Sequence, residues 1–213
     1  MDTSWLGDRR DVVVIEGPDA ATYLQSQASQ DLRGMAVGDA RWTFLLQPTG
    51  KVDVLARVTM TGDERFELDT DVGFGPELEA RLNRFKIRVK ATVEPGESAV
   101  GSTEVDEDAR IAAAWPKMGA EIVPGESIPA ETGLTEVAVS YTKGCYPGQE
   151  LVERMDSRGS TAPRHLAVLP RRPDDAPGSA VTHDGAEIGT ITSVGTTQVL
   201  AYVKRGRDAS ARD

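Results

Sequence analysis

The amino-acid sequence predicts an α+β protein, in which an N-terminal mixed sheet with helices is followed by a small C-terminal antiparallel β-barrel. Three observations lead to this prediction. The chain opens with a short apolar strand and a segment of helical periodicity. A proline-glycine turn at residues 48–50 then separates two strand-like segments, which is typical of a hairpin. After Pro163, short alternating segments are divided by proline and glycine, as in small barrels and sandwiches.

The first 70 residues predict one helix among strands. Residues 12–15 form a short apolar strand, and Asp19 is a candidate N-cap for the helix that follows. Segments 41–46 and 51–60 are the two arms of the hairpin, and residues 66–68 predict a further strand. The apolar face of the helix consists of Ala20, Tyr23, Leu24 and Ala28.

The next part of the chain changes from helical to extended periodicity. Leu78, Leu82 and Phe85 recur at helical spacing, and alternation over residues 87–91 then predicts a strand. Residues 94–107 are acidic and contain few large apolar side chains, so they predict a linker.

The last third begins with a helix and continues as strands. Gln149 and Glu150 suit the first turn of a helix over residues 148–154. We expect one domain over residues 1–160 and a second, the β-barrel, over residues 161–213. The four barrel strands are predicted at residues 165–169, 180–182, 187–193 and 198–203.

Composition narrows the function classes. The chain has 213 residues, a formal net charge of −10 and one cysteine. The acidic balance repels a phosphate backbone, so we expect no direct nucleic-acid binding. No apolar run reaches the roughly 18 residues of a membrane span, and we expect a cytoplasmic protein. A single cysteine with two histidines predicts neither an internal disulfide nor a stably bound metal.

The stretch KGCYPGQE, residues 143–150, contains that cysteine. Nearby cations and helix N-termini lower the pKa of a thiol, and Lys143, Arg154 and Arg158 are the candidate cations beside Cys145. Gly144 and Gly148 allow a sharp turn with backbone amides facing an anion. Free cysteine is also among the most buried residue types, so spacing alone leaves open whether Cys145 is reactive or inert.

Other catalytic signatures are missing from the sequence. The chain lacks GxSxG, HExxH, a Walker loop and CxxC. A dyad of Cys145 with His165 or His183 is open on composition, but both histidines fall in predicted strands or turns. We therefore do not expect a hydrolase.

The motif KGCYPGQE resembles the signature of the YgfZ family, folate-binding proteins that are related to the glycine-cleavage T-protein (aminomethyltransferase) and linked to iron–sulfur cluster assembly or repair. The resemblance covers most of the chain in order and suggests a shortened member of this family. It implies an N-terminal α+β region around a central folate cavity and a small C-terminal β-barrel. The further matching segments are residues 17–31, 45–52, 81–89, 128–131 and 185–193.

The resemblance also implies roles for individual residues. Cys145 is the functional thiol, either redox-active or a transient iron–sulfur ligand, and Lys143, Gln149 and Glu150 stand beside it in the catalytic motif. The implied cofactor is tetrahydrofolate or a derivative. The residues expected to bind it are Gly144, Tyr146, Gly148, Arg154 and Trp115.

The sequence departs from the family in the region of the folate cavity. Relatives have a much longer insert between the segments that correspond to residues 87–93 and 110–116, so we expect a cavity that is shallower or completed by a second subunit. Ala112 stands where an acidic residue helps to hold the folate ring. A buried donor left without its acceptor costs about 1 to 3 kcal/mol. Trp115 offers a stacking face instead, or is simply a buried or rim aromatic.

A further departure concerns the catalytic acid of the T-protein. The best alignment places Val54 or Leu55 at its position on the strand after the hairpin. Asp53 is adjacent, but an offset of one residue predicts that it points to the other face of the strand. Both features count against aminomethyl transfer by this chain.

Three functions remain open, and we do not expect a classical enzyme. The leading hypothesis is a folate-binding accessory protein that supports iron–sulfur enzymes, with iron–sulfur client or assembly proteins as partners and tRNA modification among the dependent processes. The second is a folate-dependent one-carbon (aminomethyl) transferase. The third is a folate-binding interaction module without chemistry, in which Cys145 only shapes its loop.

Overall fold

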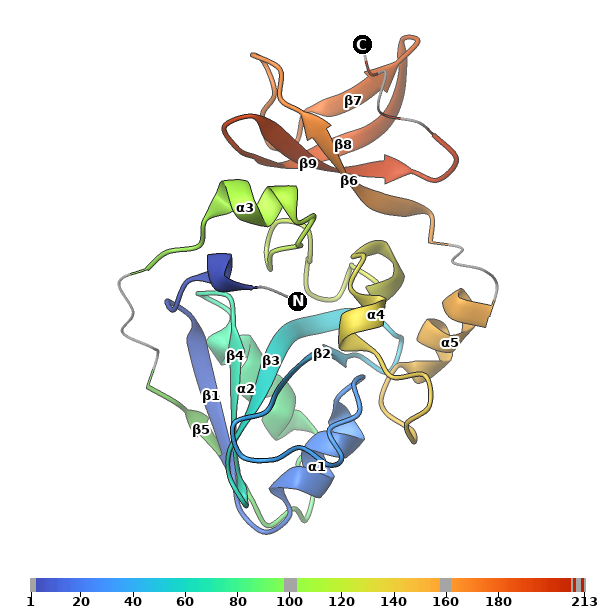
Figure 1. The fold of residues 1–213 in the computed structure, drawn as a ribbon. Helices are drawn as coiled ribbons and strands as arrows, with labels where there is room; N and C mark the ends of the chain where they lie inside the picture. Colours follow the sequence, from blue (N-terminus) through green and yellow to red (C-terminus); the bar gives the residue numbers. More distant parts are fainter. Residues whose placement is uncertain (1–2, 98–102, 158–161, 208, 210–211, 213) are drawn as a thin grey trace.

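The structure is a computed structural model that describes residues 3–97, 103–157, 162–207, 209 and 212. Two antiparallel sheets follow one another along the chain, with helices and long loops between and around them (Figure 1). The strands are β1 (Asp11–Glu16), β2 (Ala40–Leu46), β3 (Val52–Gly62), β4 (Arg65–Thr70), β5 (Thr92–Pro95), β6 (Arg164–Pro170), β7 (Ala180–His183), β8 (Ala186–Val194) and β9 (Gln198–Lys204). The helices are η1 (Ser4–Leu6), α1 (Ala20–Gln27), α2 (Gly75–Arg84), α3 (Glu107–Ala112), η2 (Pro129–Glu131), α4 (Thr135–Ala138) and α5 (Gln149–Ser157).

The N-terminal sheet has five strands in the order β2-β3-β4-β1-β5. Every pair of neighbours in it is antiparallel, so the prediction of a mixed sheet is wrong. β2, β3 and β4 follow one another through short turns and pair in sequence order, whereas β1 lies between β4 and β5 and pairs with both. Apolar residues of α1 and α2, such as Leu24 and Leu82, share one buried cluster with Ile15 and Leu68 of the sheet.

A second apolar cluster lies around β2 and the loops that follow α3. Trp42 and Phe44 of β2 pack there with Trp115, Ile122 and Tyr146. This cluster joins the sheet to the part of the chain that contains the motif at residues 143–150. Tyr146 therefore attaches the motif to the buried core of this part of the chain.

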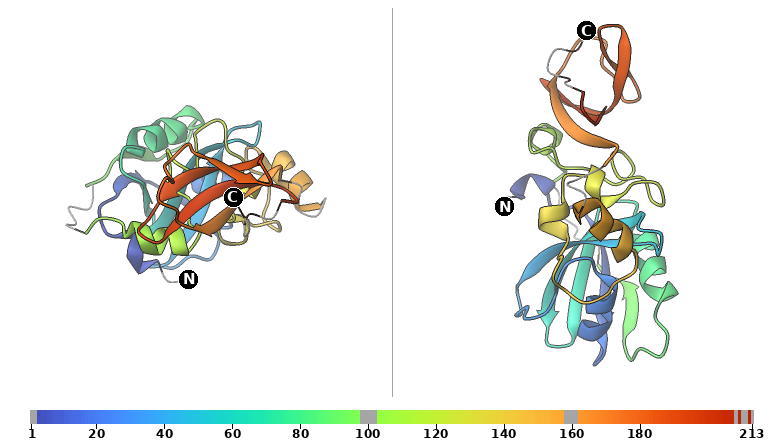
Figure 2. Two further views of the ribbon diagram at one scale, coloured as in Figure 1. Left: turned by 90° about the horizontal axis from the view of Figure 1, so that it is seen from above. Right: turned by 90° about the vertical axis from the view of Figure 1, so that its right-hand side faces the viewer.

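The C-terminal sheet has four antiparallel strands in the order β6-β9-β8-β7. The predicted barrel is not confirmed, because no pairing between β6 and β7 closes this sheet within the described residues. Figures 1 and 2 show the sheet at one end of the molecule, beyond α3. Buried hydrogen bonds hold it there: Ser193 Oγ donates to Glu121 Oε1 (2.6 Å), and the Tyr202 hydroxyl donates to the Glu121 carbonyl oxygen (3.0 Å).

Most predicted elements are present, but two local predictions are wrong. Residues 87–91 form no strand: Arg88 has a left-handed φ of 58° and Ile87 is 78% exposed, so the strand begins only at Thr92. Asp19 stands at the N-cap of α1, yet its side chain makes no cap hydrogen bond. Instead, Asp19 Oδ2 accepts from the backbone amide of Lys90 (2.7 Å), which ties the start of α1 to the segment before β5.

The proposed domain boundary near residue 160 and part of the linker at residues 94–107 lie outside the described residues, so this division stays a prediction. Within the described part of the chain, no helix is long and apolar enough to cross a membrane. The same residues contain no cluster of three or more His, Cys, Asp or Glu side chains that could hold a metal ion.

Candidate functional site

The motif loop is fixed at its start by Lys143. This side chain is 5% exposed, and its ammonium donates to the backbone carbonyls of Gln25 (2.6 Å), Ala28 and Gln30 (3.1 Å). These carbonyls lie at the C-terminal end of α1 and just beyond it, where unsatisfied acceptors favour a cation. Burial lowers the pKa of Lys143 to about 8, and the nearby Asp31 carboxylate opposes that shift.

The three carbonyls occupy all three donors of the Lys143 ammonium. Lys143 therefore joins the motif to α1 by hydrogen bonds and does not act as a hydrogen-bond donor to Cys145. Tyr146 adds a cation–π contact to this arrangement, since its ring centroid lies 5.2 Å from the Lys143 ammonium. Tyr146 is itself buried in the second apolar cluster, and burial raises the pKa of its phenol.

The end of the loop is fixed where two glycines, one in the motif and one in the hairpin turn, allow two segments to approach closely. Gly148 has a left-handed φ of 82°, and a Cβ built on it would lie 2.5 Å from the carbonyl oxygen of Gln47 in the hairpin turn. Gly50, in the same turn, has a φ of 84°, and its Cβ would lie 2.4 Å from that of Leu151 on α5. The hairpin turn and the start of α5 can approach this closely only because both positions lack a side chain.

Between these two anchors, Gly144 and Cys145 are exposed. No heavy atom lies within 4 Å of a Cβ built at Gly144, so the loop apex faces open space. The helix α5 begins at Gln149, four residues after the thiol. The structure therefore places Cys145 at an accessible apex of a loop that is held at both ends.

The remaining predicted residues have different surroundings. Gln149 Nε2 donates to Glu153 Oε1 (2.6 Å) along α5, while Glu150 and Arg154 are exposed on the same helix. Arg158, the other predicted cation, lies outside the described residues. Trp115 is 3% exposed and packs edge-to-face against two other tryptophans, with ring centroids 4.9 Å from Trp42 and 5.5 Å from Trp5.

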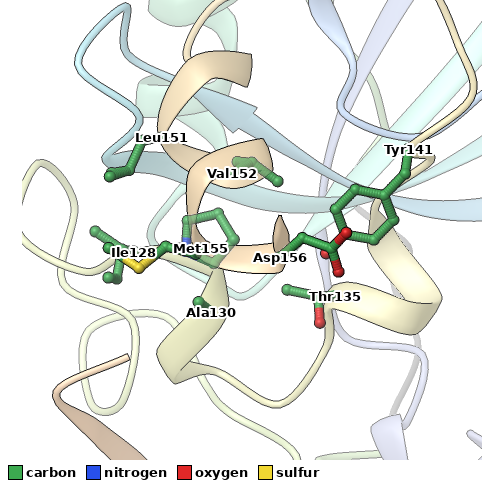
Figure 3. Close-up of a pocket in the computed structure, with 9 residues that line it drawn as sticks. Ile128, Ala130, Thr135, Tyr141, Leu151, Val152, Met155 and Asp156 are labelled. Atoms are coloured by element: carbon green, nitrogen blue, oxygen red, sulfur yellow. The ribbon is translucent and has the colours of Figure 1, made fainter. Parts of the chain in front are cut away.

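A small cavity borders α5 between η2 and α4 (Figure 3). Its volume is about 70 Å³, and none of the predicted site residues lines it. Ligand pockets for drug-sized molecules usually measure about 300 to 1,000 Å³. The residues predicted to bind folate therefore do not gather around this cavity, and the cavity is too small for a folate. Its lining residues Tyr141 and Asp156 had no signal in the sequence, because their spacing matches no known motif.

The buried carboxylate of Asp53 lies at a β-bulge in β3. Leu45 pairs with Val54 and Leu46 with Val52, which leaves Asp53 as the extra residue. The carboxylate is 2% exposed, accepts from Gln47 Nε2 at Oδ1 (2.8 Å), and places Oδ2 3.1 Å from Arg81 Nε. Among the described residues, Oδ2 is nevertheless without a hydrogen bond, since the Arg81 Nε–H is directed to the carbonyl of Leu46.

The bulge changes the predicted orientation of Asp53. Strict alternation places Asp53 and Val54 on opposite faces, but the Asp53 carboxylate meets Arg81 of α2, and the buried cluster of Val54 includes Leu78 and Leu82 of the same helix. Both side chains thus lie on the α2 side of the sheet, so the prediction that Asp53 points away from the face of Val54 is wrong. A bulge re-aims a side chain in this way.

No family model matches the chain. It is 29% identical over 194 residues to an aminomethyltransferase of Nostoc sp., covering 90% of this chain and 47% of that protein. It is 27% identical over 257 residues to the mitochondrial iron–sulfur cluster assembly factor IBA57 of Mus musculus, covering 88% and 71%. An uncharacterized protein of Haemophilus influenzae is 26% identical over 188 residues, covering 70% and 67%.

The fold matches a solved structure. The glycine cleavage system aminomethyltransferase T of Bartonella henselae superimposes with a TM-score of 0.78 at 17% identity, covering 92% of this chain and 76% of that one. The chain spans about half the length of the aminomethyltransferases it matches. The predicted resemblance is thus confirmed: the chain has the aminomethyltransferase T fold, and its distant homologues include both aminomethyltransferases and iron–sulfur cluster assembly factors.

Proposed function

We propose that this distant homologue of aminomethyltransferases and iron–sulfur cluster assembly factors is an accessory protein of iron–sulfur cluster assembly or repair, with Cys145 as its functional thiol. The observation that carries the proposal is the placement of Cys145, exposed at the apex of a loop that Lys143 and Gly148 anchor in the core. An inert structural cysteine is usually buried. A thiol held out to solvent on a fixed loop is accessible to a partner.

The chemistry asked of this thiol is modest. As a transient ligand, the Cys145 sulfur releases its proton to solvent and donates an electron pair to one iron ion of a cluster carried by a partner. Lys143, Tyr146 and Gly148 hold the loop in place, and Gln149 and Glu150 begin α5 four and five residues after the thiol. The other ligands of the cluster must come from the partner or from a small thiol, because the chain has one cysteine.

Tetrahydrofolate binding is carried over from the family resemblance and receives less support. Of the five residues proposed to contact the folate, Trp115 and Tyr146 are buried, Gly148 is covered by the hairpin turn, and Gly144 and Arg154 are exposed. They do not form one folate-sized site, so we assign no step to the cofactor. Titration of tetrahydrofolate with tryptophan fluorescence as the readout tests this part, and no binding up to millimolar ligand removes folate from the proposal.

Aminomethyl transfer is the second candidate, because four of the relatives are aminomethyltransferases. Against it, the positions aligned with the catalytic acid are Val54 and Leu55, which are 0% and 2% exposed. The neighbouring Asp53 is buried against Arg81. Formation of methylene-tetrahydrofolate from an aminomethylated carrier protein would establish this candidate over the accessory role.

Complementation tests the leading proposal. A strain that lacks its own copy of such an assembly factor is given wild-type protein, Cys145→Ser or the matched variant Thr142→Ala, which alters an exposed neighbour on the same loop. We expect Thr142→Ala to restore the iron–sulfur enzyme activities. Cys145→Ser should not restore them, although the unfolding midpoint of Cys145→Ser in urea should match that of wild type. Full restoration by Cys145→Ser would leave only an interaction module without thiol chemistry.

A further inference from the structure

The small cavity beside α5 has a polar end and an apolar end. Figure 3 shows Tyr141, Thr135 and Asp156 close together at one end, with Ile128, Leu151 and Met155 toward the other. These residues come from the η2 region, α4, the loop that follows α4, and α5, so four segments of the chain build the cavity. The proposed role of Cys145 uses none of them.

The charge of the lining selects a cation. Asp156 supplies a carboxylate, Tyr141 and Thr135 supply hydroxyl oxygens, and none of the nine lining residues is Lys, Arg or His. The ring of Tyr141 is 40% exposed and adds an electron-rich face, which attracts ammonium groups. An anion placed here would face the Asp156 carboxylate with no basic side chain among these nine residues.

The size of the cavity limits the ligand. Its 70 Å³ is far below the roughly 300 to 1,000 Å³ of pockets for drug-sized molecules, so only the end of a chain of a few atoms fits. The apolar floor favours carbon next to the charged group, since burial of each methylene is favourable. These properties together describe a short alkyl chain that ends in an ammonium group.

We propose that this cavity binds a primary alkylammonium group, with its carbons over Ile128, Leu151 and Met155 and its head at Asp156. The ammonium belongs either to a lysine side chain of a partner protein or to a free short amine. Asp156 stands seven residues after Gln149, about 10 Å along α5 at 1.5 Å per residue. A partner lysine bound here would dock near the thiol loop, which extends the proposed function but does not depend on it.

Methyl-detected NMR of the full chain tests the proposal. Propylammonium is titrated at pH 7 while the methyl resonances of Met155 and Ile128 are followed, with 1-propanol as a neutral ligand of similar shape. We expect saturable shifts with millimolar affinity for propylammonium and none for the alcohol. Equal binding of propylammonium and 1-propanol, or no shift with propylammonium, overturns the proposal.

Two variants separate a specific contact from general charge. Asp156→Asn should weaken propylammonium binding about tenfold, because it removes the charged acceptor. Glu136→Gln removes one charge from α4 at an exposed position that does not line the cavity, and should weaken binding far less than Asp156→Asn does. Equal effects of the two variants would show a bulk electrostatic attraction and refute a site.

The source of the ammonium is read from a second probe. If a partner lysine is the ligand, Nα-acetyl-lysine methylamide should bind at least as well as propylammonium; if only a free amine fits, propylammonium alone should bind. Either result supports the alkylammonium site. Cys145→Ser should bind both probes like wild type, so failure of the thiol proposal and failure of this site are distinguishable.

Discussion

Asp53→Asn is expected to destabilise the fold strongly, although it changes one atom. The substitution keeps an oxygen for the hydrogen bond from Gln47 but leaves the guanidinium of Arg81, which is 0% exposed, without its counter-charge. Removal of one partner of a buried ion pair costs about 3 to 5 kcal/mol. We expect a value near the lower end, because Arg81 still donates to the carbonyl of Leu46 (2.7 Å) and to Gln27 Oε1 (3.0 Å), and stacks on Phe85.

Urea unfolding measures this loss directly. Trp42 and Trp115 are 8% and 3% exposed, so their fluorescence reports global unfolding. The matched control is Glu67→Gln, which breaks the ion pair with Arg65 (2.8 Å); both of those side chains are more than a third exposed, and we expect a loss below about 1 kcal/mol.

The double substitution Asp53→Leu with Arg81→Met separates the ion pair from its cost of burial. If an uncompensated charge causes the loss, the double variant should be more stable than Asp53→Leu alone, since neither charge then remains in the core. A loss below about 1 kcal/mol for Asp53→Asn, or strict additivity in the cycle, would refute this account of the buried pair.

Three further predictions concern the contacts that hold the motif loop and the C-terminal sheet. Burial lowers the pKa of Lys143 to about 8 against 10.5 in the unfolded chain, so the unfolded state binds more protons between these pH values. The free energy of unfolding of wild type should therefore rise relative to that of Lys143→Met from pH 8 to 10.5, and a difference in urea unfolding that does not change with pH would contradict this. Gly148→Ala should lower the free energy of unfolding by about 1 kcal/mol or more and change the alkylation rate of Cys145, whereas Gly144→Ala, which meets no atom within 4 Å, should do neither. Tyr202→Phe should cost about 1 kcal/mol in the same urea assay by removing the buried hydrogen bond to Glu121, and an unchanged midpoint would show that this bond does not hold the C-terminal sheet.

Local patterns predicted the elements whose signal is local. The hairpin of β2 and β3, α5, and all four C-terminal strands follow from apolar patterns and turn residues that lie within or next to each element. The errors arise where a distant contact overrides the local preference. Asp19 accepts a hydrogen bond from the backbone amide of Lys90 instead of capping its own helix. The extra residue Asp53 in β3 forms an ion pair with Arg81 of α2.

The candidate site was predicted only in part for the same reason. The sequence places Lys143 two residues from Cys145 and so indicates a cation for the thiol, but the ammonium is taken up by carbonyls more than 110 positions away along the chain. Likewise, Gly148 has the backbone freedom that was predicted, yet the space it opens is filled by the hairpin turn. Neither partner can be inferred from eight residues of sequence.

The two candidate chemistries make different demands on this fold. Aminomethyl transfer of the T-protein kind would need an acid at Val54 or Leu55, and both positions belong to packed apolar clusters where an unpaired carboxylate is strongly disfavoured. Thiol chemistry needs only an accessible sulfur on a loop that stays in place. Lys143 and Gly148 hold that loop from two separate parts of the core, α1 and the hairpin turn. We therefore expect the activity of this chain to depend on Cys145 and its two anchors and to require no acid on β3.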